Sequence, residues 1–142
     1  MADPITGDVF SIEVQTGSGP IVYSEIAEVT SYDRNTQRST SKTRVFGRAT
    51  PRLGTGSREA TYTIAALLSP EDPGQAALLA AEEADTPIMV RVFADGSTDG
   101  FEQSVKVSSK RHSAKADSDW QDITFDLVEE DDAAPVAGGI VI

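Results

Sequence analysis

Residues 51–68 read PRLGTGSREATYTIAALL, a stretch in which the sequence changes character halfway along. From Thr61 onward, polar threonines alternate with apolar side chains, which are those of Tyr62, Ile64, Ala66 and Leu68. Alternation with a period of two is typical of an antiparallel strand with one buried and one solvated face. The first half is rich in glycine and hydroxyl side chains and lacks this period. The stretch therefore predicts a strand that is entered from a polar loop.

The same alternation recurs elsewhere along the chain. Its apolar members are Phe10, Ile12, Val14, Ile88, Val90, Val92, Phe101, Val105, Val107, Ile123, Phe125 and Leu127. A less regular strand is expected across residues 21–32. The turn residues of ADGSTDG, at 94–100, predict a hairpin that joins two of the strands.

One segment, SPEDPGQAALLAAEEAD at 69–85, breaks the strand pattern and predicts a short helix. Ser69 is the expected N-cap, with Asp72 three residues later, and an Ala/Leu run follows. The helix is expected to end near Ala84, before the next strand begins.

This order of elements predicts a mainly β fold, an antiparallel β-sandwich or incomplete barrel with one short α-helix over an end or open edge. A long loop across residues 33–57 is expected inside the domain, and loops of this length are usually functional or disordered. Residues 131–142, which begin within the acidic run EEDD at 129–132, are expected to form a C-terminal arm.

The composition leaves little material for catalysis or metal binding. The chain of 142 residues has no cysteine, and its one histidine, His112, stands in a polar run and is expected to be solvated. The segment DGSTDG resembles the start of a calcium loop, but Lys106 stands where an EF-hand needs a glutamate. The sequence therefore predicts no enzyme, no catalytic residue, no metal site and no cofactor. Neither a secretion signal nor an apolar run of membrane-spanning length is visible, so no membrane partner is expected.

Positive charge is concentrated in one stretch of an acidic chain. The formal net charge is -11, yet residues 34–58 hold seven of the 12 lysines and arginines and not one carboxylate. As a protein-binding element, this stretch has a complementary target on its own acidic body, which suits head-to-tail assembly. As a nucleic-acid arm it has the charge but only Phe46 as a stacking group. A solvated, disordered loop is the third interpretation.

The features together resemble the tail tube (major tail) proteins of long-tailed bacteriophages, whose fold is shared with type VI secretion tubes. The segments that carry the resemblance are DVFSIEV, EVTSYD, PRLGTGSREATYTIAALL, PGQAALLAAEEA, PIMVRVF and WQDITFDLVEED, within residues 8–130. The resemblance implies one tube-like domain, 1–130, with an N-terminal arm at 1–8 and the basic loop at 33–57, and a C-terminal arm at 131–142.

The resemblance also implies a structural virion protein of the tail, assembled in the host cytoplasm. Its subunits would form stacked hexameric rings through which DNA is ejected, with tape measure and tail terminator proteins as further partners. The DNA would pass without tight binding, because an acidic wall repels phosphate.

Two groups of residues are the candidate sites under this interpretation. Subunit contacts are expected from the basic loop, at Arg44, Phe46, Arg48, Arg52 and Leu53. The candidate lumen residues are the acids before and on the last strand, Asp117, Asp119, Asp122 and Asp126. Two alternatives stay open: a neck or tail-terminator protein that forms a single ring, and a small module that binds nucleic acid through the basic loop.

Overall fold

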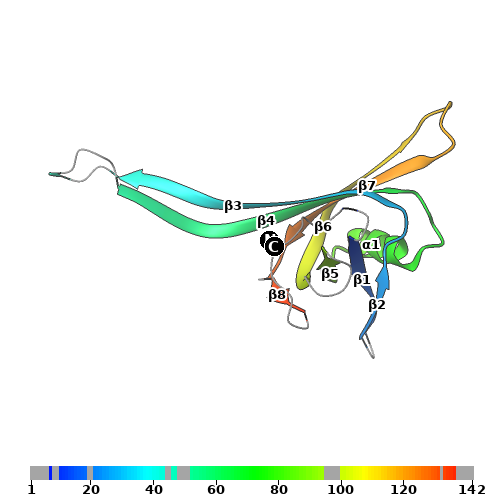
Figure 1. Cartoon of the computed structure of the whole chain (residues 1–142), viewed down its shortest axis with the longest axis horizontal. Helices are drawn as coiled ribbons and strands as arrows, with labels where there is room; N and C mark the ends of the chain where they lie inside the picture. The colour runs from blue at the N-terminus through cyan, green and yellow to red at the C-terminus, as the bar shows by residue number, and fades with distance from the viewer. Residues whose placement is uncertain are drawn as a thin grey trace, which may run out of the picture.

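The computed structural model describes residues 7, 10–18, 21–43, 46–47, 52–94, 100–131 and 133–136. The described elements are β1 (Ser11–Ser18), β2 (Ile21–Glu25), β3 (Val29–Thr43), β4 (Arg52–Leu67), α1 (Pro73–Ala84), β5 (Ile88–Phe93), β6 (Gly100–Ala114), β7 (Gln121–Glu129) and β8 (Ala134–Pro135). The strands form one antiparallel sheet in the order β2-β1-β5-β6-β7-β4-β3, and β8 pairs with β6 (Figure 1).

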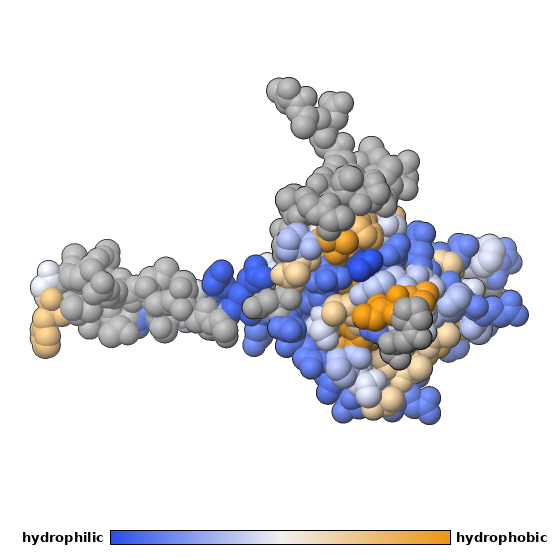
Figure 2. All heavy atoms as spheres, turned by 90° about the horizontal axis from the view of Figure 1, so that it is seen from below, coloured by the Kyte–Doolittle hydropathy of each residue, from blue (hydrophilic) through white to orange (hydrophobic). Residues whose placement is uncertain are grey.

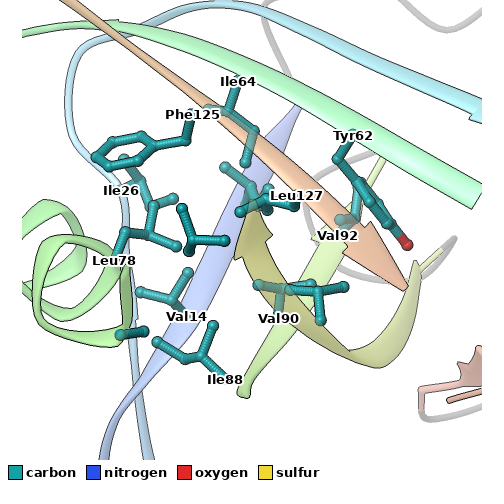
Figure 3. Packing of buried hydrophobic residues seen from close by; sticks show 14 of the residues in the cluster. Val14, Ile26, Tyr62, Ile64, Leu78, Ile88, Val90, Val92, Phe125 and Leu127 are labelled. Carbon is teal, nitrogen blue, oxygen red and sulfur yellow. The ribbon is translucent and has the colours of Figure 1, made fainter. Parts of the chain in front are cut away.

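The sheet curls around a single core, so the incomplete barrel is the architecture observed. The residues predicted to alternate inward from β1, β4, β5, β6 and β7 meet there, together with Leu78 of α1 (Figure 3). Phe10 and Tyr32 contact each other across the curl, with ring centroids 4.7 Å apart. The mainly β fold class is therefore confirmed, and burial of one face of each strand supplies its main stabilisation.

The helix begins later than predicted, and its N-cap is Asp72 and not Ser69. The Asp72 carboxylate accepts hydrogen bonds from the backbone N–H of Gln75, at 3.0 Å, and of Ala27, at 3.2 Å. Ser69 instead precedes the helix, and its backbone N–H donates to Gln75 Oε1 at 2.9 Å. The predicted end at Ala84 is confirmed, with Asp85 as a left-handed C-cap.

The strand expected across 21–32 is two strands, β2 and β3, because the chain turns between them. Glu28 has φ of 60°, a left-handed conformation that ends a strand. Ile26 holds the turn against the body of the domain. Its side chain is buried in the core, and its backbone N–H donates to the carbonyl of Ile12 at 2.9 Å.

The segment expected as a loop, 33–57, is mostly strand. Residues 33–43 belong to β3 and residues 52–57 to β4, and the two pair from Val29↔Ala66 to Thr43↔Arg52. Periodicity detects a strand by its alternation of apolar and polar side chains, and residues 33–57 show no such alternation. The prediction of an irregular loop was therefore wrong for these residues.

The two predicted arms lie largely outside the described residues. Of residues 1–8 only Gly7 is described. Of residues 131–142, β8 pairs with β6 through Phe101↔Pro135 and Glu102↔Ala134, so this part joins the sheet. Among the described residues, no helix is both long and apolar enough to span a membrane.

Candidate assembly surface

The most prominent feature of the surface is a two-stranded ribbon, which we call the arm, residues 36–60 (Figure 1). In β4, residues 61–66 pair with β7 as well as β3, whereas the described pairs of residues 52–60 are with β3 alone. At about 3.3 Å a residue, these nine residues extend the ribbon by about 30 Å beyond the sheet. Isolated two-stranded ribbons are marginally stable in water, so an arm of this length gains from a second surface to lie on.

The far end of the arm carries an exposed aromatic side chain and an exposed cation. Phe46 is fully exposed at 104% relative accessibility, and Lys42 is also exposed. Gly47 has φ of 81°, a left-handed conformation that glycine adopts without strain and that turns the chain. Figure 2 shows apolar atoms at the far end of the projection.

Three of the five predicted contact residues are placed at this far end. Phe46 lies at the tip, while Arg52 and Leu53 begin β4 opposite Thr43 and Lys42. Arg44 and Arg48 lie outside the described residues. The three predicted contact residues that the structure describes therefore lie at the same end of the arm, far from the core.

The root of the arm is fixed by a buried polar chain that the sequence did not reveal. Arg34, counted with the basic stretch, faces inward: its guanidinium lies 4.6 Å from the ring centroid of Phe101, and its Nε donates to Tyr62 Oη at 3.1 Å. The Tyr62 hydroxyl in turn donates to Gln103 Oε1. Gln103 Nε2 donates to Glu129 Oε2 and to the carbonyl of Asp131, both at 2.7 Å.

This chain explains the one polar residue on the inward face of β6. Gln103 interrupts the apolar series Phe101, Val105 and Val107, and it is 1% exposed. A glutamine among apolar residues on the inward face of a strand was therefore the signal in the sequence that could have revealed this polar chain. Burial raises the pKa of the Tyr62 phenol, because desolvation disfavours the phenolate. The neutral hydroxyl is thus kept as both donor and acceptor.

The four acids predicted to line a lumen fall into two groups. Asp122 and Asp126 are exposed on the outer face of β7, where Asp126 accepts hydrogen bonds from Thr63 Oγ1 at 3.1 Å and Ser109 Oγ at 2.7 Å. Asp117 and Asp119 are exposed in the turn between β6 and β7. The outer face of the sheet is therefore acidic and rich in hydroxyl groups around Asp126, and the turn lies beyond its end.

The β6–β7 turn, residues 115–120, also presents Trp120, which sequence reasoning did not single out. Its side chain is 64% exposed. The turn is held by Ser118, whose N–H donates to the carbonyl of Lys115 at 3.1 Å and whose Oγ accepts from the N–H of Trp120 at 3.2 Å. In Figure 1 this turn and the tip of the arm lie at opposite ends of the long axis.

Comparison with solved structures identifies the fold. The chain superposes on a subunit of the tail of an empty gene transfer agent particle, refined with C6 symmetry, with a TM-score of 0.79 and 12% identity, over 93% of this chain and 98% of that one. It is also similar to the SPP1 tail tube, with a TM-score of 0.74, 14% identity and coverage of 89% and 76%. A chain of the extended sheath–tube complex of the PVC extracellular contractile injection system matches with a TM-score of 0.67, 15% identity and coverage of 94% and 93%.

No family model and no curated protein matches the sequence. The identities to the solved structures are low, so these likenesses define the fold. The chain has the tail tube fold, as the sequence resemblance predicted.

Proposed function

We propose that this chain is a structural subunit of a tail tube, which assembles into stacked hexameric rings through which DNA is ejected into a host. The observation that carries the proposal is the arm: a basic ribbon that projects about 30 Å from an acidic body, on a fold shared with tail tubes. The C6 symmetry of the gene transfer agent tail supports six subunits a ring. Under this proposal the chain works in the virion tail after assembly in the host cytoplasm, beside tape measure and terminator proteins, and performs no catalysis.

The arm is the proposed link between subunits. Arg44, Arg48 and Arg52 would pair with carboxylates of a neighbour, because the planar guanidinium binds carboxylates with two parallel hydrogen bonds. Exposed ion pairs contribute only about 0–1 kcal/mol each. Phe46 and Leu53 are therefore the proposed apolar anchors, since burial of a large side chain contributes about 1.5–3 kcal/mol.

The outer face of the sheet around Asp126 is the proposed wall of the channel. Asp122 and Asp126 would face the passing DNA, and Asp117 and Asp119 would stand where the wall ends. Because the carboxylate of Asp126 already accepts two hydroxyl hydrogen bonds, it adds negative charge without offering a strong site to a ligand. A wall of this kind repels phosphate and lets a polyanion pass.

Electron microscopy of the purified chain tests the proposal directly. Long hollow tubes are the expected result. Closed single rings would favour a neck or terminator protein instead, and a chain that stays monomeric at high concentration would contradict the proposal.

A charge reversal tests the role of the arm. Arg44→Glu/Arg48→Glu/Arg52→Glu is expected to leave the melting temperature near that of the wild type and to abolish stacking. The matched control is the triple Arg→Lys variant, which keeps the charge and loses the two-pronged geometry; it should still form tubes, with weaker contacts. Normal tubes from a folded triple-Glu protein would show that the arm is not the link.

A further inference from the structure

The β6–β7 turn has the properties of a binding site for a protein partner. Trp120 is the only tryptophan of the chain and is 64% exposed, although tryptophan is among the residues that most often dominate interface energetics. Its backbone is fixed by the hydrogen bonds to Ser118. A backbone that is already held in place loses little conformational freedom when a partner covers it.

The charge around Trp120 is opposite to that of the arm. Residues 115–122 hold three exposed carboxylates, those of Asp117, Asp119 and Asp122, and one cation, Lys115. The far end of the arm, residues 42–53, holds Lys42 and three arginines and no carboxylate. Each end also has one exposed aromatic side chain, Trp120 on the turn and Phe46 on the arm.

Because these two ends lie at opposite ends of the molecule, they cannot meet within one chain (Figure 1). Two different, complementary patches on one subunit produce head-to-tail contacts that repeat without closing on themselves. We infer that the β6–β7 turn of one copy is the seat for the tip of the arm of a second copy. Phe46 packs against Trp120, the cations of the tip lie over the indole ring, which attracts cations, and the turn residues Asp117 and Asp119 pair with them. This inference rests on the proposed function and names the surface that receives the arm.

The single tryptophan gives a direct readout of the contact. Trp120 emission in the unassembled chain should be that of a solvated indole and should be quenched readily by acrylamide. On assembly of the wild-type chain, the emission should shift to shorter wavelength and the quenching constant should fall at least twofold. Tubes in which emission and quenching are unchanged would overturn the inference while leaving the proposed function intact. A wild-type chain that never assembles would overturn both.

Complementation of two variants tests the direction of the contact. Phe46→Ser removes the anchor of the arm and leaves the turn, whereas Trp120→Ser removes the turn's anchor and leaves the arm. Each alone should remain folded and fail to form tubes. Mixed, they should form discrete products two layers deep, because one good contact remains and propagation is blocked. Normal tubes from Trp120→Ser, or no difference between the mixture and the separate variants, would overturn the inference.

Matched substitutions separate this site from a general effect on the surface. Ile21, at the end of β2, is 63% exposed, so Ile21→Ser removes a similarly exposed apolar side chain and should leave tubes normal. Asp117→Lys/Asp119→Lys should abolish stacking, whereas Glu71→Lys/Glu83→Lys, the same charge change around α1, should not. Trp120→Phe should restore assembly that Trp120→Ser lacks. If the control variants lost tube assembly as fully as the variants of the turn, the assignment of the turn as the seat of the arm would be overturned.

Discussion

Phe125 and Val128 lie on the same strand and face opposite sides of the sheet. Phe125 is fully buried, whereas Val128 is 41% exposed. An aspartate at position 125 would bury a charge without a partner, which costs several kcal/mol and is comparable to the whole stability of a small domain. We expect Phe125→Asp, and likewise Ile64→Asp, to abolish the cooperative melt of the β-rich circular dichroism spectrum. Val128→Asp is the control and should melt like the wild type. If Phe125→Asp, Ile64→Asp and Val128→Asp all showed the same melting curve, the inward face of the strands would be assigned wrongly.

Tyr62 predicts a loss of stability at high pH. Its unfolded phenol ionises near the ordinary pKa of 10.0, and burial raises the pKa in the folded protein. Because the pKa is raised in the folded protein, the contribution of the neutral phenol to the free energy of unfolding is complete below pH 10. That contribution declines as the pH rises from 10 toward the pKa of the folded state. Burial also raises the pKa of Tyr32, so both residues act in the same direction. Melting temperatures between pH 8 and 11 should fall for the wild type and fall less steeply for Tyr62→Phe/Tyr32→Phe; equal slopes would contradict the prediction.

At the scale of elements, the start of α1 depends on one side chain. Asp72 caps the helix and also accepts a hydrogen bond from Ala27 in the turn before β3. Removal of a side-chain cap costs about 0.5–2 kcal/mol. Asp72→Ala should therefore lower the unfolding free energy by about 1–2 kcal/mol in urea titrations. Ser69→Ala is the matched comparison: because Ser69 contributes a backbone hydrogen bond here, its substitution should cost much less. A larger loss of unfolding free energy for Ser69→Ala than for Asp72→Ala would show that Ser69 is the cap.

The arm as an element should change its accessibility on assembly. Every lysine and arginine of the ribbon is a site for trypsin, and a two-stranded ribbon opens locally more easily than a strand held on both sides. Limited trypsin digestion of the unassembled chain should cut within residues 36–60 before it cuts the body. In tubes the same sites should be protected. Cleavage at equal rates in both states would show that the arm stays exposed after assembly.

At the scale of the whole molecule, the separation of charge decides how the chain meets DNA. Outside the basic stretch the chain has five cations against 23 acids, and binding to duplex DNA depends on phosphates neutralised by lysine and arginine. We expect no binding tighter than about 10⁻⁴ M near physiological salt. Fluorescence anisotropy with labelled duplex DNA measures this. Tight binding with a steep negative dependence on salt would favour the nucleic-acid module instead.

The sequence by itself determined the elements that have one buried face. Period-two alternation located the inward residues of β1, β4, β5, β6 and β7, because burial of those side chains is the same force that stabilises the strands. The end of α1 at Ala84 was equally local, since Asp85, Thr86 and Pro87 follow it and begin the next connection. The tail tube fold was visible in the order of these elements.

Only the tertiary structure decided the arm, the cap and the buried polar chain. The arm pairs through its backbone, and residues 36–59 show no alternation of apolar and polar side chains, so periodicity does not reveal it. Asp72 became the cap because the turn before β3 presents the N–H of Ala27 to the same carboxylate. Arg34 and Gln103 are polar residues whose burial depends on partners brought by other strands. Trp120 and Phe46 acquired their significance from lying at opposite ends of the molecule, a relation that no local pattern contains.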